Sequence, residues 1–287
     1  MLGSAPPAAA QDPATLPLLP ELPASTRALA LGGAFPLGFT DSDALFYNPA
    51  FAERLRGASL GVQWAGSETT LYTLSAATEF RGGAVAFGLM AVDYPGPAPF
   101  DSSVLALWAP VSTSERAALL GYSRKLLGVP LAVTGKLLEQ RTTGERNATA
   151  AADIGTGTQL GFLALGLTVQ NIGPGMTVGG RAYDLPLRAA LNAGTIGATP
   201  VGPLDLSAAA QVAWTRHGEV VPAGGLEVSY WPVSGRTFFL RLGGRRARAG
   251  EKPVTLGAGF SGDRLSIDWA WAPQDEGNMH RLGVRWR

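Results

Sequence analysis

The residue types that most often carry out chemistry in proteins are scarce in this chain. There is no cysteine, and the two histidines are His217 and His280. Neither histidine lies near a second histidine or a spaced pair of carboxylates, so the sequence predicts no metal site and no cofactor. No Gly-x-Ser-x-Gly motif is present, and the glycine-rich residues 155–157 precede no predicted helix, which disfavours a serine nucleophile and a phosphate-binding loop. We therefore predict that the protein is not an enzyme.

The overall composition is apolar and weakly charged. Hydrophobic residues make up 46% of the chain and charged residues 16%, whereas a soluble domain usually carries roughly a quarter charged residues. The formal net charge of +1 gives no electrostatic support for a nucleic-acid partner. Because the chain has no apolar run long enough for a transmembrane helix, this profile favours a β-barrel, whose strands place only alternate residues in the lipid.

From Gly57 onward, apolar residues alternate with small or polar residues in segments of about 9–13 residues, close to the length that a tilted strand needs to cross a bilayer. Leu60, Val62 and Trp64 alternate in this way with their small or polar neighbours. The 38 glycines and 21 prolines fit many strands joined by turns. The same alternation recurs at residues 84–89, 237–242 and 265–271.

Fifteen segments qualify as candidate strands, and one must be removed because single-chain bacterial barrels have an even number of strands. The weakest is residues 102–111, which follow the proline-rich residues 95–99 and contain Pro110, since interior prolines disfavour a ladder. The sequence thus predicts an all-β fold, a fourteen-stranded antiparallel transmembrane β-barrel of a bacterial outer membrane. The predicted strands start near residues 57, 68, 82, 115, 129, 148, 161, 186, 202, 219, 235, 253, 263 and 280.

Loop lengths support this count, because outer-membrane barrels have short periplasmic turns and longer outer loops. The short links fall together at residues 81–82, 127–128, 159–160, 200–203, 232–235 and 262–263, and the longer ones at residues 93–114, 141–147, 173–185, 245–252 and 273–279. A soluble β-sandwich would tolerate the same alternation, but it would not need aromatic residues at strand ends. Such residues are Trp64, Tyr72, Phe80, Trp214, Tyr230, Trp231, Trp269, Trp271 and Trp286.

The strand face opposite the apolar one would line the barrel lumen. Both signs of charge occur there, and a charge in a confined lumen needs a partner or water. The mixture predicts paired contacts between the wall and a plug, whereas a selective ion pore would show one dominant sign. Most other inward positions are Ala, Gly, Ser or Thr, which leaves room for a chain segment inside. The predicted lumen charges are Glu79, Lys136, Asp153, Arg188, Asp205, Glu227, Arg241, Asp268, Arg281 and Arg285.

Residues 1–56 do not follow the strand pattern. Residues 1–23 are predicted to be the remnant of a secretory signal followed by a stiff proline-rich linker, with a plain disordered tail as the alternative for its start. Residues 24–56 would form a hatch inside the barrel of residues 57–287. In the hatch, Gly32 and Gly33 allow close backbone approach, and residues 41–43 could cap a short helix that must end before Pro49.

Four motifs follow one another along the chain: TRALALGGAF with DSDALFYNPA at residues 26–50, VQNIGPGM at 169–176, LEVSYWP at 226–232 and GNMHR at 277–281. In this order they resemble the PorV/PorQ branch of the FadL-like outer-membrane proteins. The resemblance implies a fourteen-stranded barrel with an N-terminal hatch whose Asn-Pro-Ala element, here Asn48, Pro49 and Ala50, takes part in gating. Residues 93–114 have no counterpart in that pattern, and the chain ends in Trp-Arg where a terminal aromatic residue is usual.

Three functions stay open at this point. The first is a channel for a hydrophobic small molecule, with a lateral gap in the wall near residues 155–157. The second, implied by the resemblance alone, is a scaffold for protein partners such as secreted cargo of the type IX secretion system, with loops 93–114 and 173–185 as the contact surface. The third is a structural barrel without transport. An apolar hatch beside a wall of small residues favours the channel.

Overall fold

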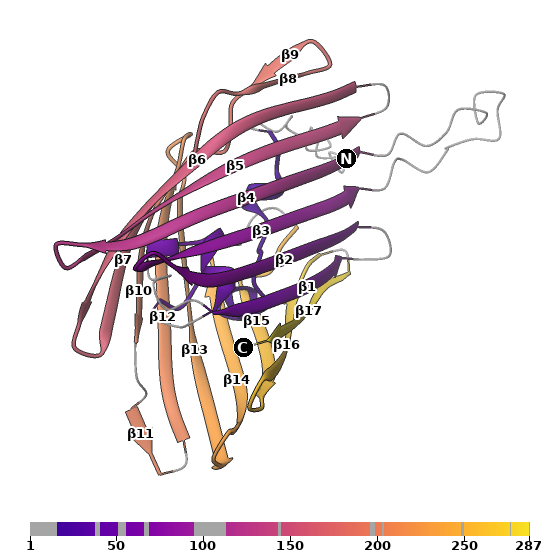
Figure 1. Ribbon diagram of the computed structural model, residues 1–287. Coiled ribbons are helices and arrows are strands. Elements are labelled where there is room, and N and C mark those ends of the chain that lie inside the picture. The colour runs from indigo at the N-terminus through magenta and orange to yellow at the C-terminus, as the bar shows by residue number, and fades with distance from the viewer. Residues whose placement is uncertain are drawn as a thin grey trace, which may run out of the picture.

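Fourteen strands form a closed antiparallel barrel in the computed structural model, which describes residues 16–37, 41–50, 56–65, 69–94, 113–142, 145–195, 199–202, 204–247, 250–275 and 277–286 (Figure 1). Each strand begins within three residues of its predicted start. The barrel strands are β1 (Gly57–Ala65), β2 (Thr69–Phe80), β3 (Gly83–Tyr94), β4 (Thr113–Leu126), β5 (Val129–Thr142), β6 (Glu145–Leu160), β7 (Leu163–Ile172), β10 (Arg188–Thr195), β12 (Leu204–Thr215), β13 (Val220–Val233), β14 (Arg236–Arg245), β15 (Val254–Ser261), β16 (Leu265–Pro273) and β17 (Asn278–Trp286).

Closure comes from two pairings that join the ends of the strand series. β1 pairs with β17, and β10 pairs with β12, so the wall has no unpaired edge within the described strands. The first and last strands therefore meet, as an even number of up-and-down strands allows. We call the end of the barrel that holds residues 81–82 and 127–128 the short-turn end, and the opposite end the loop end.

The links between strands differ from the predicted ones in three places. Residues 173–187 contain a small hairpin, β8 (Met176–Val178) paired with β9 (Arg181–Tyr183), where a plain loop was expected. β5 and β6 run on until only residues 143–144 separate them, so the predicted link 141–147 is too long. The link to β12 includes a short strand, β11 (Thr199–Val201), that pairs back on β12. Residues 95–112, which include the rejected strand at 102–111, lie outside the described residues.

The two faces of the wall divide as the alternation predicts. In β1, Leu60 is 51% exposed on the outer face, whereas Ser59 and Gln63 on the inner face are 6% and 5% exposed. Residues 84–89, 237–242 and 265–271 alternate in the same sense. None of the described helices is long and apolar enough to cross a membrane.

The N-terminal segment, meaning described residues 16–37 and 41–50, lies inside the barrel between the wall of β1–β6 and the wall of β12–β17 (Figure 1). It contains η1 (Leu19–Glu21), α1 (Thr26–Ala30) and η2 (Ser42–Phe46). α1 contacts β14–β17, η2 contacts β1–β3, and η1 contacts β3 and β4. Regular structure thus starts before residue 24, where the sequence predicts a linker without helix, and Leu19 in η1 is fully buried.

Gly32 ends α1 and makes the closest approach of the segment to the wall. Its φ of +73° forms a Schellman motif, in which Gly33 N–H donates to the Ala28 carbonyl at 2.7 Å. The Gly32 backbone packs on β14: a Cβ on Gly32 would clash with the Gly244 backbone, and a Cβ on Gly243 would clash with the Gly32 backbone. The predicted close backbone approach at Gly32 is therefore present, and it needs glycine on both sides.

η2 is a 3-10 helix whose predicted cap is absent. Residues 41–43 do precede it, but no side chain caps its N-terminus. The carboxylates are used elsewhere: Asp41 pairs with Arg285, and Asp43 accepts a hydrogen bond from Ser75 at 2.8 Å. Ion pairing inside the lumen takes the place of local capping.

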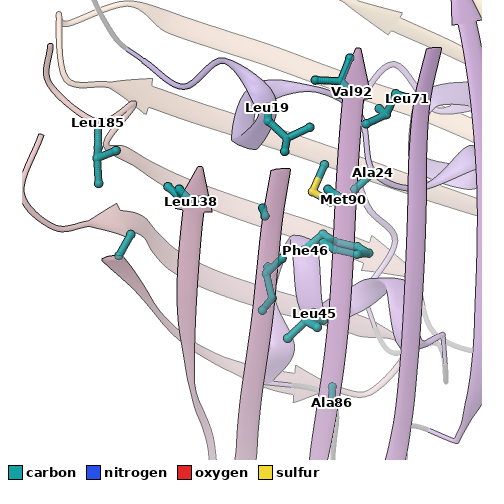
Figure 2. Packing of buried hydrophobic residues seen from close by; sticks show 13 residues of the cluster. Leu19, Ala24, Leu45, Phe46, Leu71, Ala86, Met90, Val92, Leu138 and Leu185 are labelled. Atoms are coloured by element: carbon teal, nitrogen blue, oxygen red, sulfur yellow. The ribbon is translucent and has the colours of Figure 1, made fainter. Parts of the chain in front are cut away.

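A hydrophobic cluster joins the N-terminal segment to the inner face of β2–β6 (Figure 2). Leu19, Leu45 and Phe46 come from the segment and pack against inward side chains of the strands. Burial of such side chains stabilises by about 1.5–3 kcal/mol each relative to exposure. The wall side chains in the cluster are Leu71, Ala86, Met90, Val92, Ala117, Leu119, Leu138 and Ala151.

The outer face is expected to lie in lipid, and Leu240 tests this. Its side chain is 67% exposed near the middle of β14. Leu240→Arg should lower the free energy of unfolding in lipid vesicles by about 2–4 kcal/mol, because the guanidinium would face the hydrocarbon. Leu265→Arg, at the short-turn end of β16, is the control and should cost about 0–1 kcal/mol. Denaturant titration followed by tryptophan fluorescence measures both, and equal losses would contradict a lipid-facing wall.

Candidate functional site

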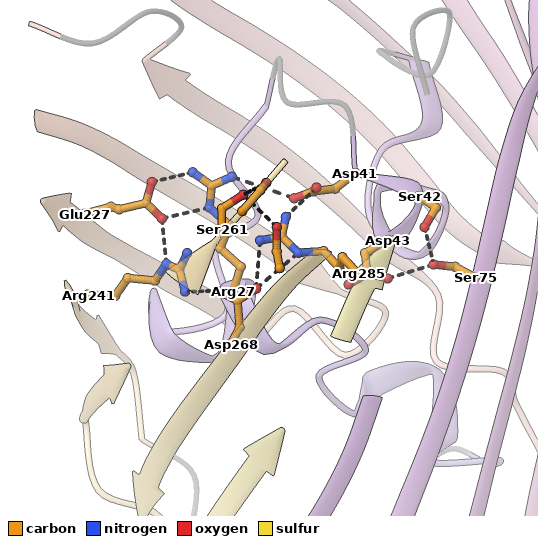
Figure 3. A network of polar contacts seen from close by, with 12 residues as sticks. Arg27, Asp41, Ser42, Asp43, Ser75, Glu227, Arg241, Ser261, Asp268 and Arg285 are labelled. Atoms are coloured by element: carbon orange, nitrogen blue, oxygen red, sulfur yellow. Dashed lines mark hydrogen bonds and ion pairs between the residues drawn. The ribbon is translucent and has the colours of Figure 1, made fainter. Parts of the chain in front are cut away.

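Six charged side chains form a closed ring of ion pairs between the N-terminal segment and the wall (Figure 3). Arg27 of α1 binds Glu227 of β13, with Nε–Oε2 at 2.9 Å and Nη2–Oε1 at 2.5 Å. Arg241 then bridges Glu227 at 2.6 Å and Asp268 at 2.5 Å. Arg285 connects Asp268, at 2.7 Å, to Asp41. Asp41 lies 3.7 Å from Arg27, which closes the ion ring.

The ion ring is neutral, because three arginines alternate with three carboxylates. Every member is at most 11% exposed, so each charge depends on its partners for the stabilisation that water would supply. Gly259 of β15 lies under the Arg241–Asp268 pair, and a Cβ there would clash with the Asp268 carboxylate. The wall is thus shaped around the ion ring.

Arg281 is a predicted lumen charge that does not belong to the ion ring. It is 1% exposed and donates to the Ala24 carbonyl at 2.6 Å and to Thr73 Oγ1, with no salt bridge among the described residues. Burial raises the pKa of the nearby Asp43 carboxyl, and the hydrogen bond from Ser75 only partly offsets that effect.

A second buried pair holds the other side of the lumen. Lys136 Nζ lies 2.7 Å from Asp153 and donates to Asn171 at 2.7 Å. Asn171 has φ +62° at a β-bulge of β7, and its side-chain amide donates to the Pro186 carbonyl at 2.8 Å. The bulge turns the Asn171 side chain inward, where it holds the end of the loop that contains β8 and β9, at Pro186.

The remaining predicted lumen charges do not join these clusters. Asp205 is half-buried on the inner face of β12, towards the short-turn end. Glu79 pairs with Arg56 in an exposed position, with side chains 54% and 70% exposed. Arg188 of β10 faces a cavity described below. Alternation places these three residues at inward positions of their strands, but it carries no information about their pairing partners.

The Asn-Pro-Ala element lies against β6 and β7. Asn48 is fully buried; its Nδ2 donates to the Thr156 carbonyl at 3.1 Å, and its Oδ1 accepts from the Ala50 N–H at 3.1 Å. Its side chain contacts the wall at Gly155 and Gly166. Pro49 is also buried. Gly32 and Gly33 lie on the far side of the lumen, so the predicted hatch residues form two anchors and not one site.

The wall beside Asn48 is closed. β6 and β7 pair from Ile154 to Leu160 with a single bulge before Ile154, and β7 pairs with β10 along its length. The lateral gap expected near residues 155–157 is therefore not open in this structure.

A cavity of about 140 Å³ lies in the loop-end half of the lumen. Residues 20–24 of the N-terminal segment border it, together with Gly32, Phe46 and Tyr47. Its wall on β3–β5 combines the apolar Met90, Leu119 and Leu138 with Lys136. Its wall on β10 and β12–β14 is polar and includes Arg188, Gln211, Thr215 and Arg245.

Three features of this region were missed by reasoning from the sequence. Arg27 and Asp41 complete the ion ring, although both stand in the TRALALGGAF and DSDALFYNPA motifs. Glu115 of β4 is 1% exposed, and its carboxylate accepts from the Leu18 and Leu19 N–H groups at 3.1 and 2.6 Å. Glu115 thereby fixes the start of η1. An acidic residue inside an alternating strand was the one signal available for it.

Among the described residues, no group of His, Asp and Glu side chains could hold a metal ion. The described lumen offers ion pairs, hydrogen bonds and apolar contact, which can hold or pass a molecule.

No protein-family model matches the chain, and no curated protein matches it. Solved structures do share its fold. The Pseudomonas putida toluene transporter TodX is 10% identical, with 90% of this chain and 95% of TodX covered and a TM-score of 0.60. CymD, a monoaromatic hydrocarbon channel, is 12% identical, with 91% and 95% covered and a TM-score of 0.51. At these identities the likeness shows the fold, and the PorV/PorQ resemblance stays a prediction.

Removing one member of the ion ring should be costly. Glu227→Gln leaves Arg27 and Arg241 without their shared carboxylate, so we expect the free energy of unfolding to fall by about 3–5 kcal/mol. Glu79→Gln, which breaks the exposed pair with Arg56, should change it by at most about 1 kcal/mol. Denaturant titration of the folded barrel compares the two variants. A Glu227→Gln loss no larger than that of the control would show that the ion ring does not fasten the segment.

Proposed function

We propose that this protein is a bacterial outer-membrane channel that takes up a small hydrophobic molecule, and that it is not an enzyme. The observation that carries the proposal is the cavity of about 140 Å³ that the N-terminal segment and the wall border together. An engineered cavity of about 150 Å³ in another protein holds benzene, so the space suits one ring. The channels that share the fold, TodX and CymD, are named for toluene and for monoaromatic hydrocarbons.

We further propose that the N-terminal segment is the plug of this channel. It contacts the wall on β1–β4, β13–β17 and, through Asn48, β6 and β7, so a molecule in the cavity meets it on the way to the short-turn end. Passage then requires part of the segment to move. The ion ring holds α1, while η2 is held by the hydrogen bonds of Ser42 and Asp43 to Ser75, by the bond from Gln170 Nε2 to the Phe46 carbonyl at 3.0 Å, and by apolar packing of Leu45 and Phe46.

The proposed exit lies in the wall next to Asn48. Gly157 of β6 faces Gly166 of β7 across the ladder, so no side chain thickens the wall there. On the outer face, the same strands border an apolar groove of about 600 Å³ with Leu167 and Leu191 on its rim. Because β6 and β7 are paired here, exit towards this groove would require the β6–β7 ladder to part as well as Asn48 to move.

The scaffold alternative would use the loop end of the barrel. Its contact surface would include the β8–β9 hairpin, whose Arg181 and Ala182 are exposed. A scaffold of this kind needs no movement of the N-terminal segment, and this difference separates the two functions experimentally.

A reversible lock tests the channel. Ser42→Cys with Ser75→Cys places two thiols where hydroxyl oxygens lie 2.7 Å apart, in a chain without cysteine. Oxidation should join η2 to β2 and suppress accumulation of labelled toluene by intact cells, and reduction should restore it, because the plug can then move. Each single cysteine variant is the control. Equal uptake in the oxidised and reduced states would contradict the moving plug and favour a scaffold or structural role.

A further inference from the structure

We infer that three arginines on the outer face of the barrel bind the phosphates of a glycolipid that carries two phosphate groups, the chemistry of lipid A in the outer leaflet of a bacterial outer membrane. Arg116 of β4, Arg141 of β5 and Arg146 of β6 form this arginine patch. The inference concerns the wall and the membrane around it, so it does not depend on the proposed channel.

The arginine patch lies at the loop end of three neighbouring strands (Figure 1). Arg116 stands opposite Glu139 in the β4–β5 ladder, and Arg141 stands opposite Arg146 in the β5–β6 ladder. Because Glu139 and Arg141 are two residues apart on one strand, all four side chains share one face of the sheet. That face is the outer one, since Leu137, at the next position of the same face on β5, is 68% exposed.

Glu139 is the acidic partner within the arginine patch, and two of the three arginines share it. It pairs with Arg141 and with Arg146, whose Nε lies 2.6 Å from Glu139 Oε2. Arg116 has no ion pair among the described residues. Glu145 is turned to the other face, where it accepts a hydrogen bond from the backbone of the β8–β9 turn at 2.8 Å. Like charges directly opposite in a ladder repel, so a further anion beside Glu139 would stabilise Arg141 and Arg146.

Exposed cations elsewhere at the loop end are compensated one to one. Arg216 lies 3.1 Å from Asp184, and Lys252 pairs with Asp275. Asp93 of β3 is a second carboxylate on the outer face near the arginine patch, opposite the residue two before Arg116. Three guanidiniums therefore face two carboxylates there, which leaves the surface cationic.

The arginine patch lies at the border of the apolar outer belt. On β4 the outward side chains between Arg116 and Arg124 are Ala118, Leu120 and Tyr122. Residues 116–124 match the roughly 9–11 residues that a tilted strand needs to cross the hydrocarbon, so the two arginines mark its two surfaces. Because the longer loops of such barrels lie outside the cell, Arg116 lies at the level of the outer-leaflet headgroups.

A glycolipid with two phosphates fits both parts of this surface. A guanidinium is planar and binds phosphate oxygens in pairs. Neighbouring strands are about 4.8 Å apart, so the patch extends about 10 Å from β4 to β6 and can reach phosphates at two points of one headgroup. The acyl chains would lie along the exposed Leu120 and Leu137, one step further into the belt. A phospholipid with a single phosphate would engage only part of the patch.

Lipid binding measured by native mass spectrometry tests the inference. The full-length protein in mild detergent is titrated with lipid A that carries two phosphates, with its monophosphoryl form and with phosphatidylglycerol. We expect lipid A with two phosphates to bind about tenfold more tightly than the monophosphoryl form, the effect of one charge-assisted contact.

Variants identify the surface responsible. Arg116→Gln combined with Arg146→Gln should remove the preference for the second phosphate and leave Glu139 paired with Arg141. Arg124→Gln combined with Arg236→Gln is the matched control, because it removes the same charge from exposed positions at the short-turn end, and it should change nothing. Heat-modifiable mobility shows whether each barrel is folded. If the first variant does not fold, Arg116→Gln alone breaks no ion pair and should weaken lipid A binding about tenfold.

Three results would overturn the inference. Equal affinity for the three lipids would reduce the patch to a general attraction for anionic headgroups. An equal loss in the Arg116/Arg146 variant and in its control would assign the effect to net charge. Absence of lipid binding would exclude the site altogether. None of these results bears on uptake through the lumen, so the channel proposal stands or falls separately.

Discussion

A barrel of fourteen strands encloses more space than its own inward side chains can fill, and this constraint shapes the rest of the molecule. Eight strands leave an interior that side chains fill, whereas sixteen or more leave an aqueous channel. Here the N-terminal segment occupies the middle of the lumen and contacts most of the strands. This filling explains the small inward residues. Side chains at Gly243 and Gly259, for example, would collide with the segment or with the ion ring.

The segment is held by two kinds of interaction on opposite sides. Towards β2–β6 it packs through Leu19, Leu45 and Phe46, and towards β13–β17 it is bound by the ion ring. Apolar packing is non-directional and tolerates sliding, whereas a buried ion pair is lost at high cost if one partner leaves. The ion ring is therefore the stronger anchor, whereas η2 and Asn48 are held by hydrogen bonds and apolar packing.

The strands were predictable because their outer faces are uniformly apolar, which sets a period of two that lipid enforces in every strand. The apolar inner cluster was not predictable. Leu119 and Leu138 each stand beside a second leucine, Leu120 and Leu137, and the sequence does not show which leucine of such a pair faces the lumen. Four of the six members of the ion ring, Glu227, Arg241, Asp268 and Arg285, follow from alternation. Arg27 and Asp41 depend on how a non-strand segment folds inside the lumen. The expected cap on η2 failed because Asp41 binds Arg285, a contact between residues far apart in sequence.

The conductance of single barrels in a planar bilayer tests most directly whether the N-terminal segment fills the lumen. The full-length chain is compared with a variant that lacks residues 16–50, after both are shown to be folded by heat-modifiable mobility. If the segment is the plug, the full-length protein conducts almost no ions and the variant opens a steady, water-filled pore, as wider unplugged barrels do. If the folded variant conducts as few ions as the full-length protein, the segment does not close the lumen.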